Sequence, residues 1–368
     1  MEEKGEKMKI LIDLTSLADN FSGIERFALS ITKELIKHEE HHWILLFKNS
    51  VHKEFEDYEV EKVVIKGTNK LIFNQIILPL KLAGMKADRY FFPAFPAPFF
   101  FFSKNAYNTI HDLSCWDCPG SNKKYMIWYF RIMYWKASLC NKKIITVSEF
   151  SKGRICSILH VKTENVSVIY NGISNQFNKD ELSEEDTKNI KDKYNLPENY
   201  VLCLSTLEPR KNLRLLLDAY ESLFNEGITA EIVLAGRKGW KMDGFLNDYS
   251  KDFLQHVHFT GFVDDEDLPA IYKLAQVFVF PSSYEGFGIP PLEALACGTP
   301  VISSDAASLP EILGAMAIYF KSSDLKALID MIKSKNYITK SINTDDAHLS
   351  RFKWSTQASK LLIRMVNK

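Results

Sequence analysis

The feature that most constrains the fold is a regular alternation of short apolar runs with segments of helical periodicity. The first apolar run covers residues 9–14 (KILIDL), and large apolar residues then recur every three or four positions, at Ile24, Phe27, Ile31 and Leu35. A short apolar run is typical of a buried strand, and the longer spacing is typical of a helix with one buried face. Strands that alternate with helices predict a parallel sheet with helices on both of its faces.

This alternation restarts in the second half of the chain, at residues 200–205 (YVLCLS), after a charged stretch. A chain of 368 residues is longer than a single core usually grows, so we expect two domains. The predicted fold class is α/β, with two Rossmann-like doubly wound parallel-sheet domains that face a cleft. We predict residues 1–175 as the first domain, 176–196 as a linker, 197–345 as the second domain, and 346–368 as a C-terminal helix that packs back on the first.

Charge and hydropathy exclude several classes of protein. The formal net charge is +0, which gives no long-range attraction to nucleic acid, and we expect no nucleic-acid partner. The first seven residues (MEEKGEK) are too polar and acidic for a signal peptide. The chain also lacks an apolar run of about 18 residues that would span a membrane. We therefore expect a cytoplasmic protein.

A pair of cations follows the first predicted strand of the second domain. The run at 208–212 (EPRKN) lies between that strand and a predicted helix, for which Asn212 is a candidate N-cap. Ligands of open parallel sheets bind beyond the carboxyl ends of the strands. The planar guanidinium of Arg210 and the point charge of Lys211 suit a diphosphate. The alternative is that both are solvated loop cations, and their position after a strand favours the diphosphate site.

The segment 283–293 (SYEGFGIPPLE) has the most informative pattern. Gly286 and Gly288 let the backbone approach a ligand closely, and the two prolines suit the first turn of a helix, whose amides attract phosphate. We expect Glu293 in that first turn, where it would accept both hydroxyls of a ribose or complement the helix dipole. Glu285 lies in the glycine loop, with no helix to stabilise, and is the stronger candidate for a functional charge.

Two further patterns have a structural alternative. His111 follows a predicted strand, and on its own a histidine in that position is more often structural than catalytic. The triplet 265–267 (DED) is similar to a metal-binding motif, but it starts a predicted helix, where acidic residues are favoured as caps. We interpret it as capping. We expect neither a metal nor a cofactor, because Arg210 and Lys211 would already neutralise a diphosphate.

Together these segments resemble glycosyltransferase family 4, the retaining, mannosyltransferase-like group 1 glycosyltransferases with the GT-B fold. Glu285 and Glu293 match the family's E-x7-E motif. Further matches follow in the family's order along most of the chain, at 23–26 (GIER), 111–112 (HD), 146–151 (TVSEFS), 168–172 (VIYNG), 208–212 (EPRKN), 261–263 (GFV) and 296–301 (ACGTPV). The loop before the first helix departs from the common pattern, because it has one glycine where many members have two.

The resemblance implies a role for each matching residue. The first domain would bind the acceptor, and the second would bind the nucleotide sugar. The catalytic residues would be His111 beneath the reacting sugar, Glu285, and the diphosphate-binding pair Arg210 and Lys211. Glu293 would hold the ribose. The other donor-binding positions would be Gly23 at the start of the first helix, Phe262 and Val263 beside the base, and the backbone amides of Phe287, Gly288 and Ile289.

The implied activity is that of a retaining hexosyltransferase in surface polysaccharide biosynthesis. It would move a hexose from a nucleotide-diphosphate sugar to a saccharide or lipid-linked acceptor. GDP-mannose is favoured as the donor, and UDP-hexoses stay open. Because no pair of carboxylates is arranged for a double displacement, we expect the acceptor hydroxyl to attack from the leaving-group face. The alternatives are a GT-B nucleotide-sugar epimerase and a noncatalytic GT-B partner subunit, which would not need to keep the charged motif residues.

Residues 121–155 are rich in aromatic side chains and hold eight Lys or Arg and one acidic residue, Glu149. A cationic aromatic surface suits an anionic lipid headgroup, whereas apolar residues all round a helix suit burial. The pattern favours burial against the sheet. The alternative is peripheral contact with the inner face of the plasma membrane.

Overall fold

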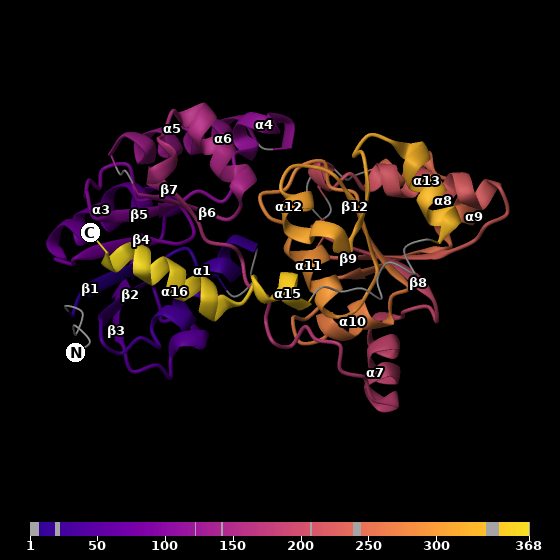
Figure 1. Cartoon of the computed structure of the whole chain (residues 1–368), viewed down its shortest axis with the longest axis horizontal. Coiled ribbons are helices and arrows are strands. Elements are labelled where there is room, and N and C mark those ends of the chain that lie inside the picture. The colour runs from indigo at the N-terminus through magenta and orange to yellow at the C-terminus, as the bar shows by residue number, and fades with distance from the viewer. Residues whose placement is uncertain are drawn as a thin grey trace. The chain divides into compact units, whose positions relative to one another are not determined.

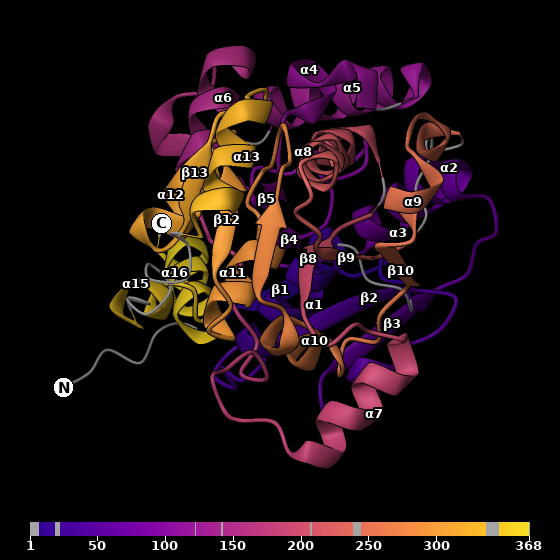
Figure 2. The same ribbon diagram turned by 90° about the vertical axis from the view of Figure 1, so that its right-hand side faces the viewer.

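The computed structural model describes residues 7–18, 23–121, 123–140, 143–206, 208–237, 244–335 and 346–367. Contacts between Cα atoms divide the chain into two compact units. The first comprises Met1–Gly172 and Phe352–Lys368, and the second comprises Ile173–Arg351. Each unit is built on its own parallel sheet (Figures 1 and 2).

The sheet of the first unit has seven strands in the order β3-β2-β1-β4-β5-β6-β7. Its strands are β1 (Lys9–Asp13), β2 (His42–Lys48), β3 (Glu61–Ile65), β4 (Arg89–Phe92), β5 (Ala106–Thr109), β6 (Ile144–Thr146) and β7 (Val166–Val168). The central strands β4 and β5 are buried along their whole length, as expected for a parallel sheet covered on both faces. The strand order reverses between β1 and β4, which pair directly.

The helices of the first unit connect these strands and close it with the end of the chain. They are α1 (Gly23–Leu35), α2 (Lys70–Ile72), the π-helix η2 (Phe73–Ile77), α3 (Leu78–Gly84), α4 (Ser114–Asp117), α5 (Lys124–Cys140), α6 (Glu149–Leu159) and α16 (Trp354–Val366), with short 3₁₀ turns η1 (Lys53–Phe55), η3 (Pro119–Ser121) and η4 (Thr163–Asn165). The last helix, α16, packs against α1, and its Trp354 ring lies 5.9 Å from that of Phe27. A side chain at Gly172 would collide with the Trp354 ring, so this glycine permits the contact.

The second unit repeats the same topology with six strands in the order β10-β9-β8-β11-β12-β13. The strands are β8 (Tyr200–Leu204), β9 (Glu231–Ala235), β10 (Val257–Gly261), β11 (Val277–Phe280), β12 (Val301–Ser304) and β13 (Ile318–Phe320). The order reverses between β8 and β11, which again pair directly. In both units, this reversal marks the place where doubly wound sheets bind ligands, outside the carboxyl ends of the strands.

Helices cover the second sheet as they cover the first. They are α7 (Glu184–Tyr194), α8 (Leu213–Asn225), α9 (Lys251–Leu254), α10 (Leu268–Leu274), α11 (Ile289–Ala296), α12 (Leu309–Leu313), α13 (Leu325–Ser334) and α15 (Asp346–Ser350), with 3₁₀ turns η5 (Pro209–Lys211), η6 (Phe245–Asp248) and η7 (Gly314–Met316). The apolar stripe of α8 packs with α13 on one face of the sheet, around Leu216, Leu217 and Leu328. The charged segment 176–196 contains α7 and lies within this unit.

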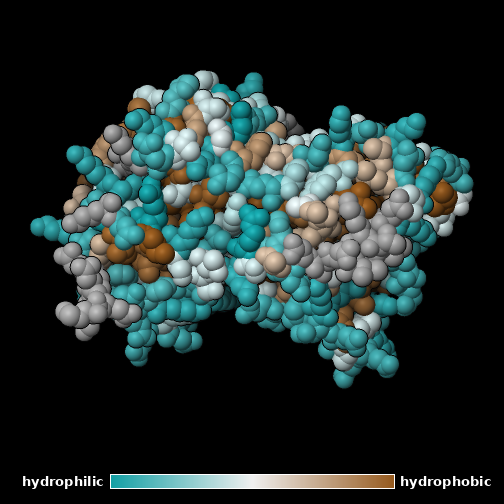
Figure 3. All heavy atoms as spheres, in the orientation of Figure 1, coloured by the Kyte–Doolittle hydropathy of each residue, from teal (hydrophilic) through white to brown (hydrophobic). Residues whose placement is uncertain are grey.

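On the face that Figure 3 shows, the coloured surface is largely hydrophilic, with separate groups of hydrophobic side chains. No helix in the described ranges is both long and apolar enough to cross a membrane.

Candidate active site

The predicted charged residues of the second unit meet at the reversal of its strand order. The chain leaves β8 into η5, which carries Arg210 and Lys211, and it leaves β11 into the loop that carries Glu285. Ser283 joins these two segments, because its amide and its hydroxyl both donate to the Arg210 carbonyl oxygen, at 2.9 and 3.0 Å. Two loops that are distant in sequence therefore form one rigid edge at the carboxyl ends of β8 and β11.

A buried carboxylate holds the two cations in place. The Lys211 ammonium lies 2.7 Å from Glu285 Oε1, and the Arg210 guanidinium lies 3.5 Å from Oε2. Arg210 also donates to the carbonyl oxygen of Tyr284 at 3.2 Å and to the Glu208 carboxylate at 3.0 Å. A charge inside a protein requires partners of opposite charge, and each partner here has a fixed direction. The arrangement pre-positions two cations at the sheet edge.

The charge state of Glu285 follows from this arrangement. Burial alone would raise the pKa of the carboxyl group, but Lys211 and Arg210 beside it hold the pKa below its usual range. Glu285 is therefore ionised at neutral pH. Its charge keeps the cations oriented in the absence of any anionic ligand.

The backbone that follows Glu285 is shaped for close approach. Gly288 has a φ of +97° and caps α11, and a Cβ at this position would lie 2.5 Å from Leu309 Cδ2. Pro290 and Pro291 have no N–H group, so the donors at this helix start belong to Phe287, Gly288 and Ile289. The buried Ser308 hydroxyl lies 3.0 Å from the carbonyl oxygens of both Glu285 and Phe287 and fixes the loop.

Glu293 occupies a different part of α11 than the sequence suggested. The helix begins at Ile289, so Glu293 lies in its second turn, and the expectation of a first-turn residue is wrong. Its side chain is buried, and Oε2 accepts a hydrogen bond from the Tyr272 hydroxyl at 3.1 Å. Because helix-dipole effects are confined to the first turn, complementation of the dipole does not explain this buried carboxylate.

Phe262 and Val263 follow β10, two strands away from β8 in the sheet order. The Phe262 ring is 49% exposed, and the Arg237 guanidinium lies 4.3 Å from its centre. Val263 is buried. An exposed ring with a cation on one face offers its other face for stacking.

The remaining predicted residues, Gly23 and His111, belong to the first unit. Gly23 is the first residue of α1, and His111 lies just after β5. The imidazole is buried, its Nε2 lies 2.9 Å from the carbonyl oxygen of Pro93, and its ring packs edge-on against Phe27 at 5.2 Å.

Burial lowers the pKa of His111 to about 4, although the Pro93 carbonyl and Asp112 act to raise it. The ring is therefore neutral at pH 7. A neutral ring that donates from Nε2 to Pro93 has an unprotonated Nδ1, which can accept a hydrogen bond from a ligand hydroxyl.

Asp267 and Asn212 lie at the N-cap positions that the sequence predicted, but neither side chain makes a capping hydrogen bond. Asp267 occupies the N-cap position of α10, but its carboxylate accepts from the Lys193 ammonium at 2.6 Å and the Tyr194 hydroxyl at 2.7 Å. A charge-assisted bond to lysine is stronger than a bond to a backbone amide, and it takes the carboxylate away from the helix end. Asn212 occupies the N-cap position of α8, yet its amide donates to the carbonyl oxygen of Ser322 at 2.9 Å. Across the described ranges, no group of three or more His, Cys, Asp or Glu could hold a metal.

Sequence reasoning missed the residues that support the motif. Ser283, Ser308 and Tyr272 fix the two loops and Glu293, but each is a common residue with no distinctive spacing. Sequence reasoning also missed the close approach of the backbone at Gly236 to that at Ser205. A Cβ at position 236 would collide with the Ser205 carbonyl oxygen. The only available signal was the position of Gly236 directly after a predicted strand.

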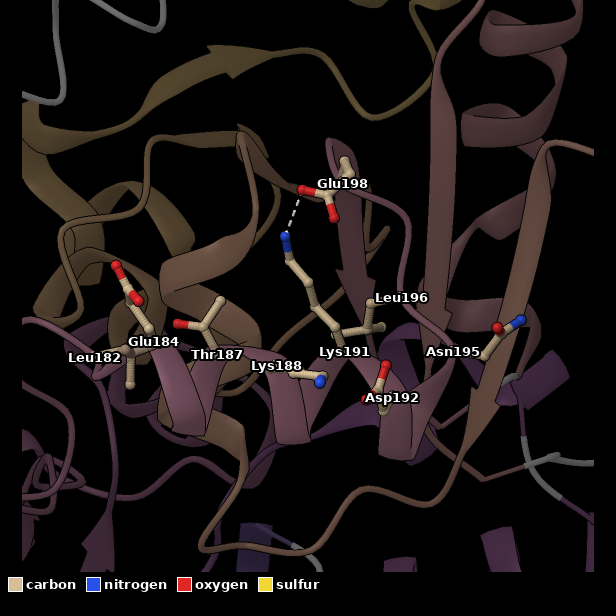
Figure 4. Close-up of a pocket in the computed structure, with 9 residues that line it drawn as sticks. All are labelled: Leu182, Glu184, Thr187, Lys188, Lys191, Asp192, Asn195, Leu196 and Glu198. Carbon is tan, nitrogen blue, oxygen red and sulfur yellow. Dashed lines mark hydrogen bonds and ion pairs between the residues drawn. The ribbon is translucent and has the colours of Figure 1, made fainter.

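A hollow of about 530 Å³ lies along α7 in the second unit (Figure 4). Lys191 extends from the helix to the Glu198 carboxylate, 2.6 Å away. The lining residues, from Leu182 to Glu198, all precede β8 in the sequence. None of the predicted donor-binding residues lines it, and its position before β8 separates it from the carboxyl-end edge described above.

Comparison with known proteins shows similarity to glycosyltransferases. Residues 185–335 match the family model of glycosyl transferases group 1. The chain is 33% identical over 228 residues to the O-antigen chain mannosyltransferase B of Escherichia coli, which covers 61% of this chain and 59% of that protein. It is 28% identical over 253 residues to the O-antigen chain mannosyltransferase RfbU of Salmonella typhimurium, covering 68% and 66%. The chain thus matches less than two thirds of the length of these relatives.

Solved structures share the fold over nearly the whole chain. HepE of Anabaena in complex with UDP and glucose superimposes with a TM-score of 0.71 at 18% identity, covering 98% of this chain and 100% of that one. WaaG, a glycosyltransferase involved in lipopolysaccharide biosynthesis, gives a TM-score of 0.72 at 14% identity with the same coverage. The predicted fold class of two Rossmann-like parallel-sheet domains, the GT-B fold of glycosyltransferases, is confirmed.

Proposed function

We propose that this protein is a retaining hexosyltransferase that uses a nucleotide-diphosphate sugar. The observation that carries the proposal is the cluster of Arg210, Lys211 and Glu285, which holds two cations in fixed directions at a sheet edge suited to ligand binding. The matches to group 1 glycosyl transferases and to O-antigen mannosyltransferases support the same reaction class.

In this proposal, the cluster binds the donor. Arg210 and Lys211 contact the diphosphate, and the amides of Phe287, Gly288 and Ile289 at the start of α11 add backbone donors. Glu293 accepts from the ribose hydroxyls. Among the remaining donor contacts, the base stacks on the exposed face of Phe262 beside Val263, and Gly23 opens α1 toward the ligand.

The chemistry requires stabilisation of a leaving group. As the bond between the sugar C1 and the β-phosphate oxygen breaks, negative charge develops on the diphosphate. Cations and amides that are already oriented stabilise that charge without reorganising. The acceptor oxygen bonds to C1 on the face that the phosphate leaves, and the proton of the acceptor hydroxyl passes to a phosphate oxygen. The product keeps the anomeric configuration of the donor.

For His111, we propose contact with the hydroxyl groups of the reacting sugar. Its neutral ring offers Nδ1 as an acceptor while Nε2 stays bonded to the Pro93 carbonyl. A neutral ring at this place avoids repulsion of the positive charge that develops on the sugar.

For the donor and the setting, we propose GDP-mannose before UDP-hexoses, because the curated relatives named above are mannosyltransferases. The alternative donor is a UDP-hexose, because the structurally similar HepE was solved in complex with UDP and glucose. We propose an acceptor that is a saccharide or a lipid-linked saccharide of a surface polysaccharide. The protein would work on the cytoplasmic side, at the inner face of the plasma membrane.

The proposal is tested by incubating the protein with GDP-mannose or UDP-glucose and a panel of free and alkyl-linked sugars. Nucleotide release and the anomeric configuration of the product are measured, the latter by NMR. We expect acceptor-dependent release and an α-linked product, both lost in Lys211→Ala and kept in Lys188→Ala, which removes an exposed lysine of α7. Release of nucleotide and free sugar without any glycoside would favour the epimerase, and no reaction with any donor would favour the noncatalytic subunit.

A further inference from the structure

A second carboxylate, Glu208, occupies one edge of the Arg210 guanidinium. The Nε and Nη2 groups on this edge both donate to Glu208 Oε1, at 3.3 and 3.0 Å. The remaining nitrogen, Nη1, donates to the Tyr284 carbonyl oxygen at 3.2 Å and lies 3.5 Å from Glu285 Oε2. An arginine binds a carboxylate or a phosphate through two adjacent N–H groups. Glu208 therefore covers an edge of Arg210 that would also suit a phosphate.

The local backbone directs the Glu208 side chain to this position. Glu208 is the N-cap residue of η5 and has an extended conformation, with a φ of −134° and a ψ of 156°. Its side chain makes no capping hydrogen bond, because the Lys211 amide donates to the backbone carbonyl oxygen of Glu208, at 3.0 Å. The carboxylate instead reaches Arg210, two residues further along the turn. Glu208 thus acts on the arginine and not on the end of the helical turn.

The cluster of Arg210, Lys211, Glu208 and Glu285 has no net charge, because its two cations and two carboxylates sum to zero. The diphosphate of a nucleotide carries more than one negative charge at neutral pH, so it is attracted to a site with net positive charge. When the Glu208 carboxylate moves away from Arg210, the other three groups keep a net positive charge. The attraction of this cluster for a diphosphate therefore depends on where Glu208 lies.

The two carboxylates differ in how easily a ligand can replace them. Glu285 contacts both cations, and its side chain is 9% exposed. Its displacement would leave buried charges without a partner. The hydrogen bonds from Arg210 to Glu208 both fall on one oxygen, and the Glu208 side chain is 18% exposed. A carboxylate nearer the solvent is hydrated when it turns away, so its ion pair costs less to break.

We propose that Glu208 is an exchangeable partner of Arg210 that sets the affinity of this site for a nucleoside diphosphate. The inference rests on the proposed hexosyltransferase function. Before the donor binds, Glu208 fixes the direction of Arg210. The diphosphate then takes the place of the carboxylate, which turns toward solvent. After the transfer, Glu208 returns to Arg210 and favours release of the nucleotide product. Glu208 is a positioning residue in this scheme, because it acts through Arg210.

The charge of Glu208 is tested by calorimetric titration of the full chain with GDP and with UDP. Glu208→Gln removes the charge and keeps an oxygen that can accept from Arg210. We expect this variant to bind the preferred diphosphate at least about threefold more tightly, the fold-change that the loss of one partly exposed charge pair produces. A residue that only supported the loop would give weaker or equal binding, and either result would overturn the proposal.

Glu198→Gln is the matched control for the loss of one negative charge. Glu198 pairs with Lys191 at 2.6 Å, and its side chain is 83% exposed. It precedes β8, whereas Glu208 follows that strand, so the two glutamates belong to opposite ends of β8. We expect Glu198→Gln to bind the diphosphate as the wild type does. An equal gain in both variants would indicate a general effect of net charge and would contradict an exchange at Arg210.

Glu208→Ala tests the positioning part of the proposal. This variant lacks the negative charge, as Glu208→Gln does, but it also lacks the oxygen that accepts from Arg210. We expect it to bind the diphosphate less tightly than Glu208→Gln, because the guanidinium is no longer held in one direction. Equal binding by these two variants would contradict the positioning role.

Initial rates of transfer test the effect on product release. In Glu208→Gln, the KM for the donor and the inhibition constant of the nucleoside diphosphate should both fall by about threefold or more, in line with the change in affinity. A lower kcat with unchanged KM and unchanged product inhibition would show that Glu208 only supports the loop, and it would overturn the exchange.

The wild type separates this inference from the function on which it rests. If the wild type binds a nucleoside diphosphate and Arg210→Ala does not, but Glu208→Gln shows no gain, the assignment of Glu208 alone fails. If the wild type binds neither GDP nor UDP, the proposed donor site fails first, and the role of Glu208 fails with it.

Discussion

The two units have the same sheet topology, yet they place opposite kinds of surface at the reversal of strand order. In the second unit this place is ionic, with Arg210 and Lys211 held by the buried Glu285. In the first unit it is a largely apolar cavity with a few polar groups around Asp13. The shared topology gives both sheets the same reversal of strand order, while the side chains at the strand ends make this place ionic in one unit and largely apolar in the other.

The largest expected effect tests the ionic side of this comparison. Lys211→Ala removes the nearest partner of Glu285 and should lower kcat/KM by about 10²–10³-fold, because the proposed mechanism then loses an oriented cation at the leaving group. It should also reduce the free energy of unfolding by about 3 kcal/mol, since a buried carboxylate loses its closest partner. Steady-state kinetics and urea unfolding measure the two effects.

Combining Lys211→Met with Glu285→Gln separates the two effects of Lys211→Ala. Removing both charges should restore most of the stability, because no unpaired buried charge remains, but activity should stay low. Recovery of activity in the double variant would show that the cations do not act on the leaving group.

The next effect concerns acid stability in the first unit. His111 has a pKa of about 4 in the folded protein and about 6.5 when unfolded. Between these values the unfolded state binds the proton and the folded state does not, so stability falls as the pH drops through this window, by up to about 3 kcal/mol. Urea unfolding at pH 7 and pH 5 should show a smaller acid loss in His111→Gln than in the wild type. An equal loss would mean that His111 does not remain neutral in the folded protein.

Protonation of Glu285 should also lower the free energy of unfolding as the pH falls, but at a lower pH. Its folded pKa is held below the usual range, so its contribution is present above the ordinary glutamate pKa and is lost as the pH falls below it. The loss from the second unit should therefore begin at a lower pH than the loss from His111.

A smaller effect is expected at the glycine loop, the proposed donor contact. Gly288→Ala places a Cβ against Leu309 at a positive φ and should cost about 2 kcal/mol of stability and weaken nucleotide binding. Gly153→Ala in α6 is the matched control. A Cβ there meets nothing within 4 Å, so the change should stabilise the helix by up to about 1 kcal/mol. Thermal unfolding with and without nucleotide measures stability and nucleotide binding in both variants. Equal stability and equal nucleotide binding of the two variants would contradict the claim that the loop requires glycine at position 288.

The smallest effect is expected at the proposed base contact. Phe262→Ala removes a half-exposed ring and should leave stability nearly unchanged while lowering nucleotide affinity by about 1–2 kcal/mol, the usual contribution of base stacking. Phe259→Ala, with a 46% exposed ring in β10, is the control. Titration calorimetry measures both, and equal affinities would place the base elsewhere.

The sequence predicted the ionic site far better than the cavity, for a physical reason. Buried charges demand particular partners, so Arg210, Lys211 and Glu285 could be recognised from residue type and position relative to the predicted strands. The alternation of apolar runs likewise predicted the two parallel sheets. The cavity is lined by residues such as Met126 and Tyr129, which are equally typical of a core. The expectation that apolar residues all round α5 mean burial is wrong, because one side of the helix carries exposed apolar side chains. Only the folded chain shows that this side is left uncovered.

The capping residues illustrate the same limit at smaller scale. Asp267 and Asn212 occupy the predicted N-cap positions, but long-range partners, Lys193 and the Ser322 carbonyl, take their side chains. A local pattern identifies the position of a side chain along a helix. It does not identify the more distant group that competes for that side chain.

The most direct test of the central claim is the melting temperature of the purified protein with GDP, UDP, ADP, dTDP and their sugars, without added metal. A nucleotide that binds only the folded state raises the melting temperature by mass action. The account predicts an increase with one nucleotide, GDP before UDP, that is lost in Arg210→Ala and Glu293→Ala and kept in Lys188→Ala. No increase with any nucleotide, or an increase that survives in Arg210→Ala and Glu293→Ala, would contradict the assignment of the donor site.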